Sequence, residues 1–283
     1  MEWIKHLNKS IDYIEKNLAG DVSYEEAARL AATSVYHYQR MFSYMADITL
    51  GEYIRRRRLS RAAEDLQRGG KVIDIAMKYG YESPTSFTRA FKAVHGINPS
   101  QAQDEGAELK SFSKLVFSIQ IKGVESMDYR IETKDEFRSV GYRMPMAEKI
   151  EENFNNIPSF WNKISSEGSL QNVISLMDGT LEGVLGVSDF VPGREENYYY
   201  IAVATQKDLP KGMYENTIPS CKWAIFPGEG EMPTALQDLT KRIMSEWFPT
   251  SGFDWGEAPD IELYINADPK NSKFEIWVPI KEK

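Results

Sequence analysis

The sequence contains very little cysteine and histidine. Cys221 is the single cysteine, so the chain can form no internal disulfide and no zinc site built from several thiolates. The three histidines, His6, His37 and His95, show no spacing typical of metal ligands. Because no histidine follows His95, residues 96–283 cannot supply a histidine-based catalytic triad. We therefore predict no metal and no cofactor.

Long apolar runs and common catalytic motifs are absent as well. No stretch approaches the roughly 18 apolar residues that a membrane-spanning helix needs. The first residues, Met1-Glu-Trp-Ile-Lys5, lack the apolar core of a signal peptide, so the sequence predicts a cytoplasmic protein without a membrane partner. No glycine-rich phosphate loop, GxSxG or HExxH motif occurs, and we assign no catalytic residue.

Charge is divided unevenly along the chain, whose formal net charge is −8. Residues 1–103 hold 15 Lys and Arg against 12 Asp and Glu, whereas residues 104–283 hold 19 against 30. A weakly basic first part and an acidic second part favour a DNA-facing module joined to a module with another task.

Residues 72–99 have the pattern of a helix-turn-helix. Ser83 can cap a helix, and Pro84 suits its first position. The buried stripe of this helix is expected at Phe87, Phe91 and Val94, with the end at Gly96 and Pro99. A shorter helix over residues 72–79 precedes it. The outward residues of the second helix are hydroxyls and cations, which suits a helix presented to a DNA groove.

A similar unit comes earlier, after an amphipathic helix over residues 4–18. Ser23 and Glu26 form a capping-box pattern that opens a short helix, and a second helix follows Ser34. Val35, Tyr38 and Phe42 are its expected buried face, which leaves Tyr36, His37, Gln39 and Arg40 for solvent or DNA. Gln and Arg side chains can each read base edges in a major groove.

A longer helix over residues 50–66 joins the two units. It carries four consecutive arginines, Arg55 to Arg58, that point around the whole helix. They fit either a solvated, partly salt-bridged helix or a helix in which one or two of them contact DNA phosphates.

This arrangement resembles the DNA-binding domain of the AraC/XylS family of transcription factors over about residues 4–101. Its most specific parts are Gln39-Arg-Met-Phe42, Ile73 to Tyr81, Ser86 to Lys92, and Gly96-Ile-Asn-Pro99. The resemblance implies that Tyr36, Gln39 and Arg40 read one major groove. It implies that Thr85, Ser86 and Arg89 read the next groove, with Lys92 on a phosphate. It also implies RNA polymerase as a partner if the protein is an activator. The aromatic-basic pair that usually follows the family's proline is replaced here by Ser100-Gln-Ala102, which puts one backbone contact in doubt.

Residues 104–124 are predicted to be a linker between the two domains, and residues 112–121 fit either a strand or a short helix. From residue 125 on, alternating strands and amphipathic helices appear. Strands are expected near residues 128–133, 137–144, 183–189 and 198–204, and again at 221–226, 261–265 and 274–280. Helices are expected over residues 154–164, with Pro158 in the first turn, and over residues 233–248. A spacing of about 76–80 residues between equivalent strands indicates an internal duplication of a strand–helix–strand–strand unit.

The duplication, together with Pro259 to Tyr264 and Phe274 to Pro279, resembles the GyrI-like small-molecule-binding domain over roughly residues 125–282. The predicted fold class is therefore multidomain: an all-α double helix-turn-helix DNA-binding domain at residues 1–103 and an α+β duplicated domain at residues 125–283.

Glu262 is the residue singled out in the second domain. Strand alternation places it on one face with Tyr264, opposite Ile261, Leu263 and Ile265. A buried carboxylate needs compensation, and a cation stacked on aromatic rings provides it. The alternative is a solvent-facing glutamate on a half-exposed sheet. In GyrI-like proteins a glutamate at this position often faces the cavity, so the resemblance favours a pocket. Its expected lining is Tyr264, Trp223, Trp255, Tyr142 and Tyr199.

The sequence thus predicts a transcriptional regulator that binds double-stranded DNA and a small hydrophobic, possibly cationic effector. Two alternatives remain open. The second domain could serve only protein contacts, or it could be a hydrolase that relies on Glu with Tyr or Trp, as reported for some GyrI-like proteins.

Overall fold

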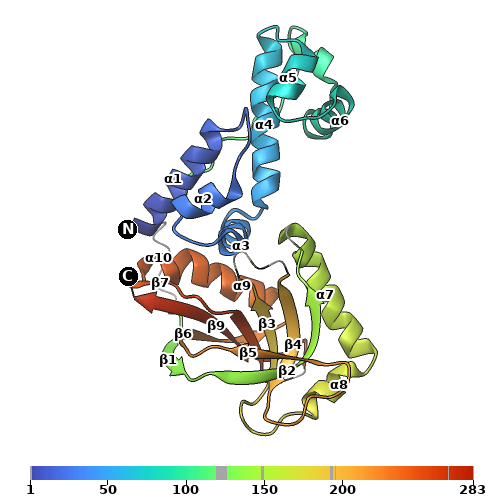
Figure 1. The fold of residues 1–283 in the computed structure, drawn as a ribbon. Coiled ribbons are helices and arrows are strands. Elements are labelled where there is room, and N and C mark those ends of the chain that lie inside the picture. Colours follow the sequence, from blue (N-terminus) through green and yellow to red (C-terminus); the bar gives the residue numbers. More distant parts are fainter. Residues whose placement is uncertain are drawn as a thin grey trace. The chain divides into compact units, whose positions relative to one another are not determined.

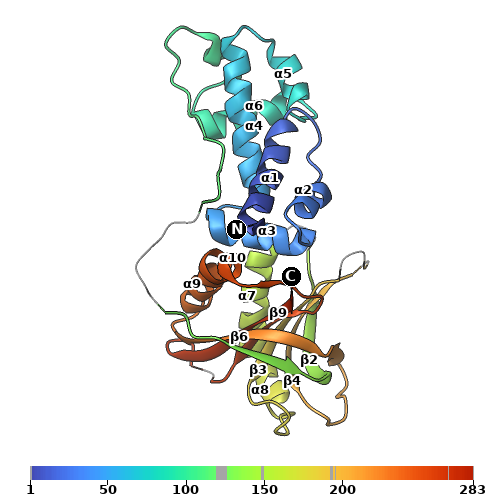
Figure 2. The ribbon, with the colours of Figure 1, turned by 90° about the vertical axis from the view of Figure 1, so that its left-hand side faces the viewer.

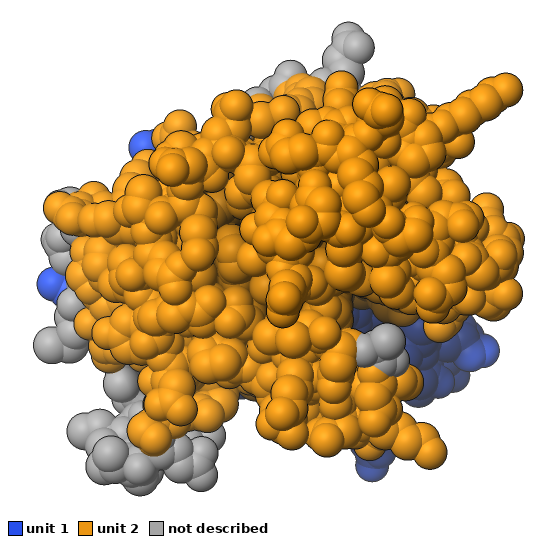
Figure 3. Space-filling model, turned by 90° about the horizontal axis from the view of Figure 1, so that it is seen from below, with its two compact units in different colours: residues 1–120 blue, residues 121–283 orange. Residues whose placement is uncertain are grey.

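The computed structural model describes residues 2–118, 126–147, 150–191, 194, 196–266 and 268–282. The chain forms two compact units, residues 1–120 (unit 1) and 121–283 (unit 2), which Figure 3 colours separately. No helix among the described residues is both long enough and apolar enough to cross a membrane.

The regular elements among the described residues of unit 1 are all helices (Figure 1). Its elements are α1 (Glu2–Lys16), α2 (Tyr24–Leu30), α3 (Val35–Ala46), α4 (Leu50–Gln67), α5 (Val72–Lys78), α6 (Pro84–His95) and the 3-10 helix η1 (Pro99–Gln103). The pairs α2–α3 and α5–α6 are the two predicted helix-turn-helix units, and α4 is the predicted connecting helix.

The predicted helix caps are confirmed. Ser23 and Ser34 accept hydrogen bonds from the amides of Glu26 and His37, at 3.0 and 3.2 Å, where α2 and α3 begin. Ser83 caps α6 by accepting from the Ser86 amide, and Gly96 ends α6 with a φ of 83°. Phe87, Phe91 and Val94 are buried, so the period of the apolar stripe correctly identified the inner face of α6.

The four consecutive arginines of α4, Arg55 to Arg58, are all engaged within unit 1. Arg55 and Arg56 pair with Glu52 on the helix surface. Arg57 forms a buried ion pair with Glu15 of α1, in which Nε and Nη2 lie 2.7 and 2.6 Å from the two carboxylate oxygens. Arg58 donates to the carbonyl oxygens of Leu18 and Gly20, at 3.0 and 2.5 Å. Arg57 and Arg58 thus attach α1 and the loop after it to α4.

The segment predicted to be a linker begins as part of unit 1. Residues 109–118, which we call the strap, run beside α4 (Figure 2) and are neither helix nor strand. Leu109 and Phe112 pack on the core formed by α4, α5 and α6, and Phe117 contacts Phe42 of α3 with ring centroids 6.0 Å apart. The part of residues 112–121 beyond position 118 lies outside the described residues.

Unit 2 is an antiparallel sheet with helices. The strands are β1 (Arg130–Lys134), β2 (Phe137–Pro145), β3 (Val184–Asp189), β4 (Tyr198–Ala204), β5 (Tyr214–Ile218), β6 (Cys221–Gly230), β7 (Phe253–Trp255), β8 (Asp260–Tyr264) and β9 (Ser272–Glu282). Their order is β1-β6-β9-β8-β3-β4-β2-β5, and β7 pairs with β9. The helical segments are α7 (Ile150–Ser166), α8 (Ser169–Ile174), α9 (Thr234–Arg242), the π-helix η2 (Ile243–Trp247) and α10 (Phe248–Thr250).

The predicted duplication is visible in this topology. The run β2-α7-α8-β3-β4 and the run β6-α9-η2-α10-β7-β8-β9 repeat the order strand, helices, two strands, with the short β7 added in the second run, and β3 and β8 pair at the centre. Some details were not predicted. The helix α8 and the short strands β5 and β7 were missed. Pro158 lies inside α7 because that helix already begins at Ile150, and the second helix is interrupted by a π turn.

The two faces of the sheet bury different cores. One face holds Trp223, Trp277 and Ile261 among a large apolar cluster. The other face packs on helices: α7 and α8 cover Val140, Ile201 and neighbouring residues, and Trp247 of η2 lies edge-on to Phe226, 5.0 Å away. Glu262 is aligned with Ile276, and Ile276 with Phe226, so Glu262 points to the helix-covered face.

Candidate functional site

The outer face of α6 has the properties of a DNA-reading surface. Thr85, Ser86, Arg89 and Lys92 are exposed, on the side of the helix away from Phe87 and Phe91. Among the described residues neither Arg89 nor Lys92 forms an ion pair, so both cations are available to phosphates or base edges.

The matching residues of the first unit are on α3. Tyr36 and Arg40, one turn apart, lie on the side of that helix away from Tyr38 and Phe42, and Gln39 lies between the two sides. His37 lies beside the cap of α3, where its Nδ1 is 2.8 Å from Ser34 Oγ. Contact of these residues with DNA stays a prediction.

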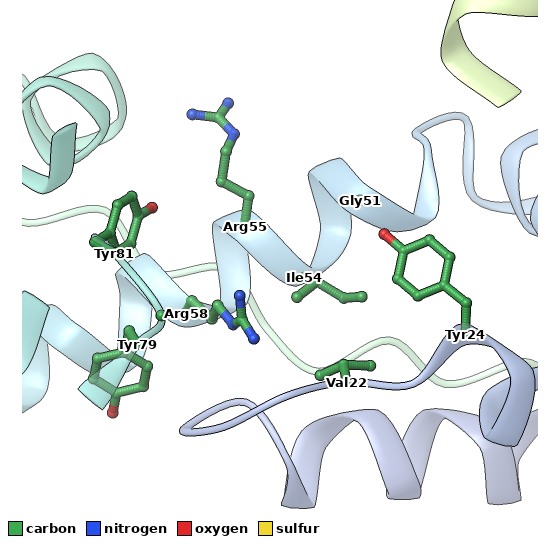
Figure 4. A pocket seen from close by; sticks show the side chains of 9 residues that line it. Val22, Tyr24, Gly51, Ile54, Arg55, Arg58, Tyr79 and Tyr81 are labelled. Carbon is green, nitrogen blue, oxygen red and sulfur yellow. The ribbon is translucent and has the colours of Figure 1, made fainter. Parts of the chain in front are cut away.

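A pocket of about 290 Å³ separates the two helix-turn-helix units of unit 1. Figure 4 shows Val22 and Tyr24 of the first unit on one side, Tyr79 and Tyr81 of the second on the other, and Arg58 of α4 between them. The two units thus do not fill the space between them on this side of α4.

Glu262 lies in a cluster of aromatic side chains in unit 2. Tyr264 and Tyr199 donate hydrogen bonds from their hydroxyls to the same oxygen, Oε2, at 2.9 and 3.4 Å. Trp161 of α7 donates from Nε1 to the Tyr199 hydroxyl at 2.9 Å. Its ring meets Tyr264 edge-on with centroids 4.9 Å apart. Glu262, Tyr264 and Trp161 are half-buried and Tyr199 is buried, so this carboxylate is surrounded by rings without being sealed off.

Gly186 provides the space for this cluster. It pairs directly with Glu262 across the β3–β8 ladder. A Cβ atom at position 186 would lie 2.3 Å from the Tyr199 hydroxyl oxygen and 3.2 Å from Glu262 Oε2. Since β3 and β8 are equivalent strands of the duplication, one repeat supplies the carboxylate at this position and the other supplies a residue without a side chain.

Tyr142 belongs to the same face but stands further away. It is aligned with Ile201, which is aligned with Gly186 and so with Glu262. Three strand spacings correspond to roughly 14 Å between the Cα atoms of Tyr142 and Glu262. Tyr142 packs against the cluster under α7 and α8, and its contact with a ligand stays a prediction.

Trp223 and Trp255 were expected beside Glu262, and the structure separates them from it. Trp223 is fully buried on the opposite face of the sheet, against Trp277 at a ring distance of 5.8 Å. Trp255 is aligned with Ile280, four residues along β9 from Ile276, or roughly 13 Å. There it stacks on Phe248 at 5.0 Å. Assigning Trp223 to the pocket was wrong because alternation on β6 sends it to the other core.

Sequence reasoning overlooked Trp161 and Gly186 as members of the site. Trp161 was assigned to the buried stripe of its helix, whose period cannot distinguish a core ring from a ring beside a ligand. Gly186 had a usable signal, because it occupies in the first repeat the position that Glu262 occupies in the second.

Comparison with known proteins gives matches to both parts of the chain. Residues 127–281 match the family model of the GyrI-like small molecule binding domain, and residues 27–105 match that of a helix-turn-helix domain. The HTH-type transcriptional activator AarP of Providencia stuartii is 42% identical over 95 residues, which make up 33% of this chain and 70% of AarP. The multiple antibiotic resistance protein MarA of Escherichia coli K12 is 33% identical over 94 residues, 33% of this chain and 74% of MarA.

Unit 2 also resembles a solved structure. SAV2435, solved bound to tetraphenylphosphonium, matches 55% of this chain and 94% of its own length, with a TM-score of 0.50 and 24% identity. At that identity the likeness establishes a shared fold.

Proposed function

Since the chain belongs to the GyrI-like family and joins this small-molecule-binding domain to an AraC-type DNA-binding domain, we propose a transcriptional regulator whose effector is a hydrophobic cation bound beside Glu262. DNA binding and small-molecule binding follow from the two families. The chemical class of the effector and the residues that contact it are the proposal.

The arrangement around Glu262 carries this proposal. A carboxylate attracts a cation, and the rings of Trp161, Tyr199 and Tyr264 offer apolar contact and cation–π attraction to the same ligand. The related fold of SAV2435 in complex with tetraphenylphosphonium supports a ligand of this class. The acidic charge of residues 104–283 favours the approach of cations in general.

Replacing Glu262 with Gln tests the role of the carboxylate, because the change keeps the shape and removes the charge. We expect the Kd for tetraphenylphosphonium to rise at least about tenfold, or about 1.4 kcal/mol. The Kd for the neutral ligand triphenylphosphine oxide should change little. Isothermal titration of both ligands gives these values. Glu182→Gln, on an exposed residue, removes the same charge elsewhere in unit 2 and should leave both affinities unchanged. Equal loss in the two variants would contradict a local role of Glu262.

We further propose that α3 and α6 read successive major grooves about one helical turn apart, with Tyr36, His37, Gln39 and Arg40 on one side and Thr85, Ser86, Arg89 and Lys92 on the other. If the protein is an activator, the bound complex would also contact RNA polymerase. DNA binding further implies that the protein acts in the cytoplasm.

Two substitutions in α6 separate base reading from phosphate contact. Arg89→Ala should weaken binding by about 1–3 kcal/mol and relax the sequence preference at one half of the site. Lys92→Ala should weaken binding to all sequences alike and flatten its salt dependence. Fluorescence anisotropy at several salt concentrations measures both effects, with the exposed Lys270→Ala of unit 2 as a charge-matched control. If Arg89→Ala binds every duplex as wild type does, α6 is not a recognition helix.

We infer a regulatory rather than an enzymatic role, because the relatives AarP and MarA are named as regulators and resistance proteins. A hydrolysis assay with activated esters checks this inference. Turnover by the wild type that Glu262→Gln abolishes would establish a hydrolase instead.

A further inference from the structure

The two helix-turn-helix units of unit 1 make few contacts with each other. The helices α5 and α6 of the second unit pack on α4 and on each other, whereas α2 of the first unit packs on α1 and α3, and α3 reaches α4. On one side the two units face each other across the pocket of about 290 Å³. Their relative orientation therefore depends on whatever connects both of them to α4. The strap, residues 109–118, contacts both units and α4 in one continuous stretch.

At its C-terminal end the strap is attached to the first unit and to α1, which packs on α2. The Phe117 ring meets Phe42 of α3 with centroids 6.0 Å apart. Asn8 of α1 exchanges two hydrogen bonds with the backbone of Phe117, donating to its carbonyl and accepting from its amide, each at 2.9 Å. The Leu115 amide donates to the hydroxyl of Tyr53 at 3.1 Å. That hydroxyl in turn donates to Glu15 of α1 at 2.7 Å. This end therefore binds α1 and α4 together.

At its N-terminal end the strap is attached to the second unit. The Lys110 amide donates to Nδ1 of His95, the last residue of α6, at 3.2 Å. The side chains of Leu109 and Phe112 pack on the core that also contains Phe87 and Phe91. This end of the strap is therefore anchored to α6 and not to α1.

The middle of the strap is held by α4. The Phe112 amide donates to Ser60 Oγ at 3.0 Å, and the Phe112 carbonyl accepts from Arg57. Arg57 is the residue whose buried ion pair with Glu15 anchors α1. Because backbone groups of Phe112 and Leu115 each bond to a particular side chain of α4, these hydrogen bonds fix one register of the strap along that helix.

We propose that the strap sets the relative orientation of the two helix-turn-helix units and so determines which spacing between two DNA half-sites the protein accepts. This inference depends on the proposed reading of DNA by both α3 and α6. Without the strap the units would be joined through α4 alone, and each could tilt toward a displaced half-site at small cost.

The experiment uses the full chain and the duplex that the wild type selects from a random library. Inserting one base pair between the half-sites moves them apart by about 3.4 Å and rotates one around the other. We expect the insertion to weaken wild-type binding at least about tenfold. The double variant Asn8→Ala with Tyr53→Phe, which releases the C-terminal end of the strap, should lose no more than about threefold on the same insertion.

A control variant must show that lower stability alone does not make the protein tolerate the inserted base pair. Ile75→Val removes one methyl group from the core of the second unit and leaves the hydrogen bonds of the strap in place. For this variant the inserted base pair should weaken binding as much as it does for the wild type. If the double variant unfolds, Tyr53→Phe alone removes only one of the hydrogen bonds that hold the strap. For this variant the inserted base pair should weaken binding by a factor between those of the wild type and the double variant. If the inserted base pair weakens binding of the strap variants as much as that of the wild type, the proposal for the strap is wrong, while the reading of DNA by two helices still holds. Wild-type indifference to the insertion overturns the two-site reading of DNA, and the proposal with it.

Discussion

His95 connects the end of α6 to the strap through a neutral imidazole. Its Nδ1 accepts the Lys110 amide, so its Nε2, 3.2 Å from the Leu59 carbonyl, carries the proton and donates. The side chain is 5% exposed. Burial lowers the pKa of His95 below its ordinary value, and the positive charge of Lys110 acts in the same direction. Protonation would remove the acceptor that Lys110 uses.

We expect unit 1 to lose stability in acid through this residue. A histidine whose pKa is lowered in the folded state stabilises the fold above its ordinary pKa of about 6.5. That contribution is lost as the pH falls from about 6.5 toward the lower folded value, because the unfolded chain binds the proton first. Urea unfolding of unit 1 in the full chain between pH 8 and pH 5 should show this decline in the wild type and a smaller one in His95→Gln. Identical pH profiles for the two proteins would contradict the assignment.

At the scale of elements, the two helix-turn-helix turns have the same backbone path with different residues. Ala32 follows α2 with a φ of 56°, and Gly80 follows α5 with a φ of 77°. In each turn the next amide returns to a carbonyl of the preceding helix, Thr33 to Ala28 at 3.1 Å and Tyr81 to Ala76 at 3.0 Å. The left-handed conformation suits glycine and strains alanine, so only the first turn contains strain.

Exchanging the residue type at these positions should have opposite effects. Gly80→Ala should lower the free energy of unfolding by about 1 kcal/mol. The cost comes from the backbone, since the added Cβ would be 3.4 Å from Arg58 Nη1, an ordinary contact. Ala32→Gly should be neutral or stabilising by up to about 1 kcal/mol, because relief of strain offsets the greater freedom of glycine in the unfolded chain. Chemical denaturation measures both, and a larger loss for Ala32→Gly than for Gly80→Ala would contradict this explanation.

In the whole molecule, the helical unit 1 does not end with α6, because the strap at residues 109–118 belongs to it as well. The strap covers apolar surface with Leu109 and Phe112 and supplies partners to Arg57, Ser60 and Tyr53. A unit that ended at residue 103, where the sequence predicted its boundary, would expose that surface and leave those polar groups to water.

Two fragments test this boundary. A fragment of residues 1–118 should be more stable than one of residues 1–103 by at least about 2 kcal/mol, since burying a single Leu or Phe side chain contributes about 1.5–3 kcal/mol. Thermal unfolding followed by circular dichroism compares them. Val116→Ala in the longer fragment is the control, because Val116 is 65% exposed and its loss should matter little. Equal melting temperatures of the two fragments would mean that the strap adds nothing to the fold.

Most helices and strands, and the order of the two parts, could be predicted from local sequence patterns. Ser34, Ser83 and Gly96 mark helix ends through local hydrogen bonds and backbone preference, which need no distant residue. The alternation around Glu262 correctly placed it with Tyr264, because neighbours on one strand share a face at every second position. The duplication was readable for the same reason, since its period lies in the chain itself.

How these elements meet depends on contacts between residues far apart in the sequence, and these could not be predicted. The strap has no period of its own, and its partners Asn8, Tyr53 and His95 are far from it in sequence. The four consecutive arginines of α4 form a uniform run in sequence, yet they differ in the structure. Arg55 and Arg56 share Glu52 of their own helix, whereas Arg57 and Arg58 bind Glu15 and the backbone after α1, because the partner depends on what packs against that side of the helix. Trp223 was wrongly predicted to line the pocket beside Glu262. The face of the sheet on which its side chain lies depends on the register of β6 against β9, which is set by pairing between distant strands.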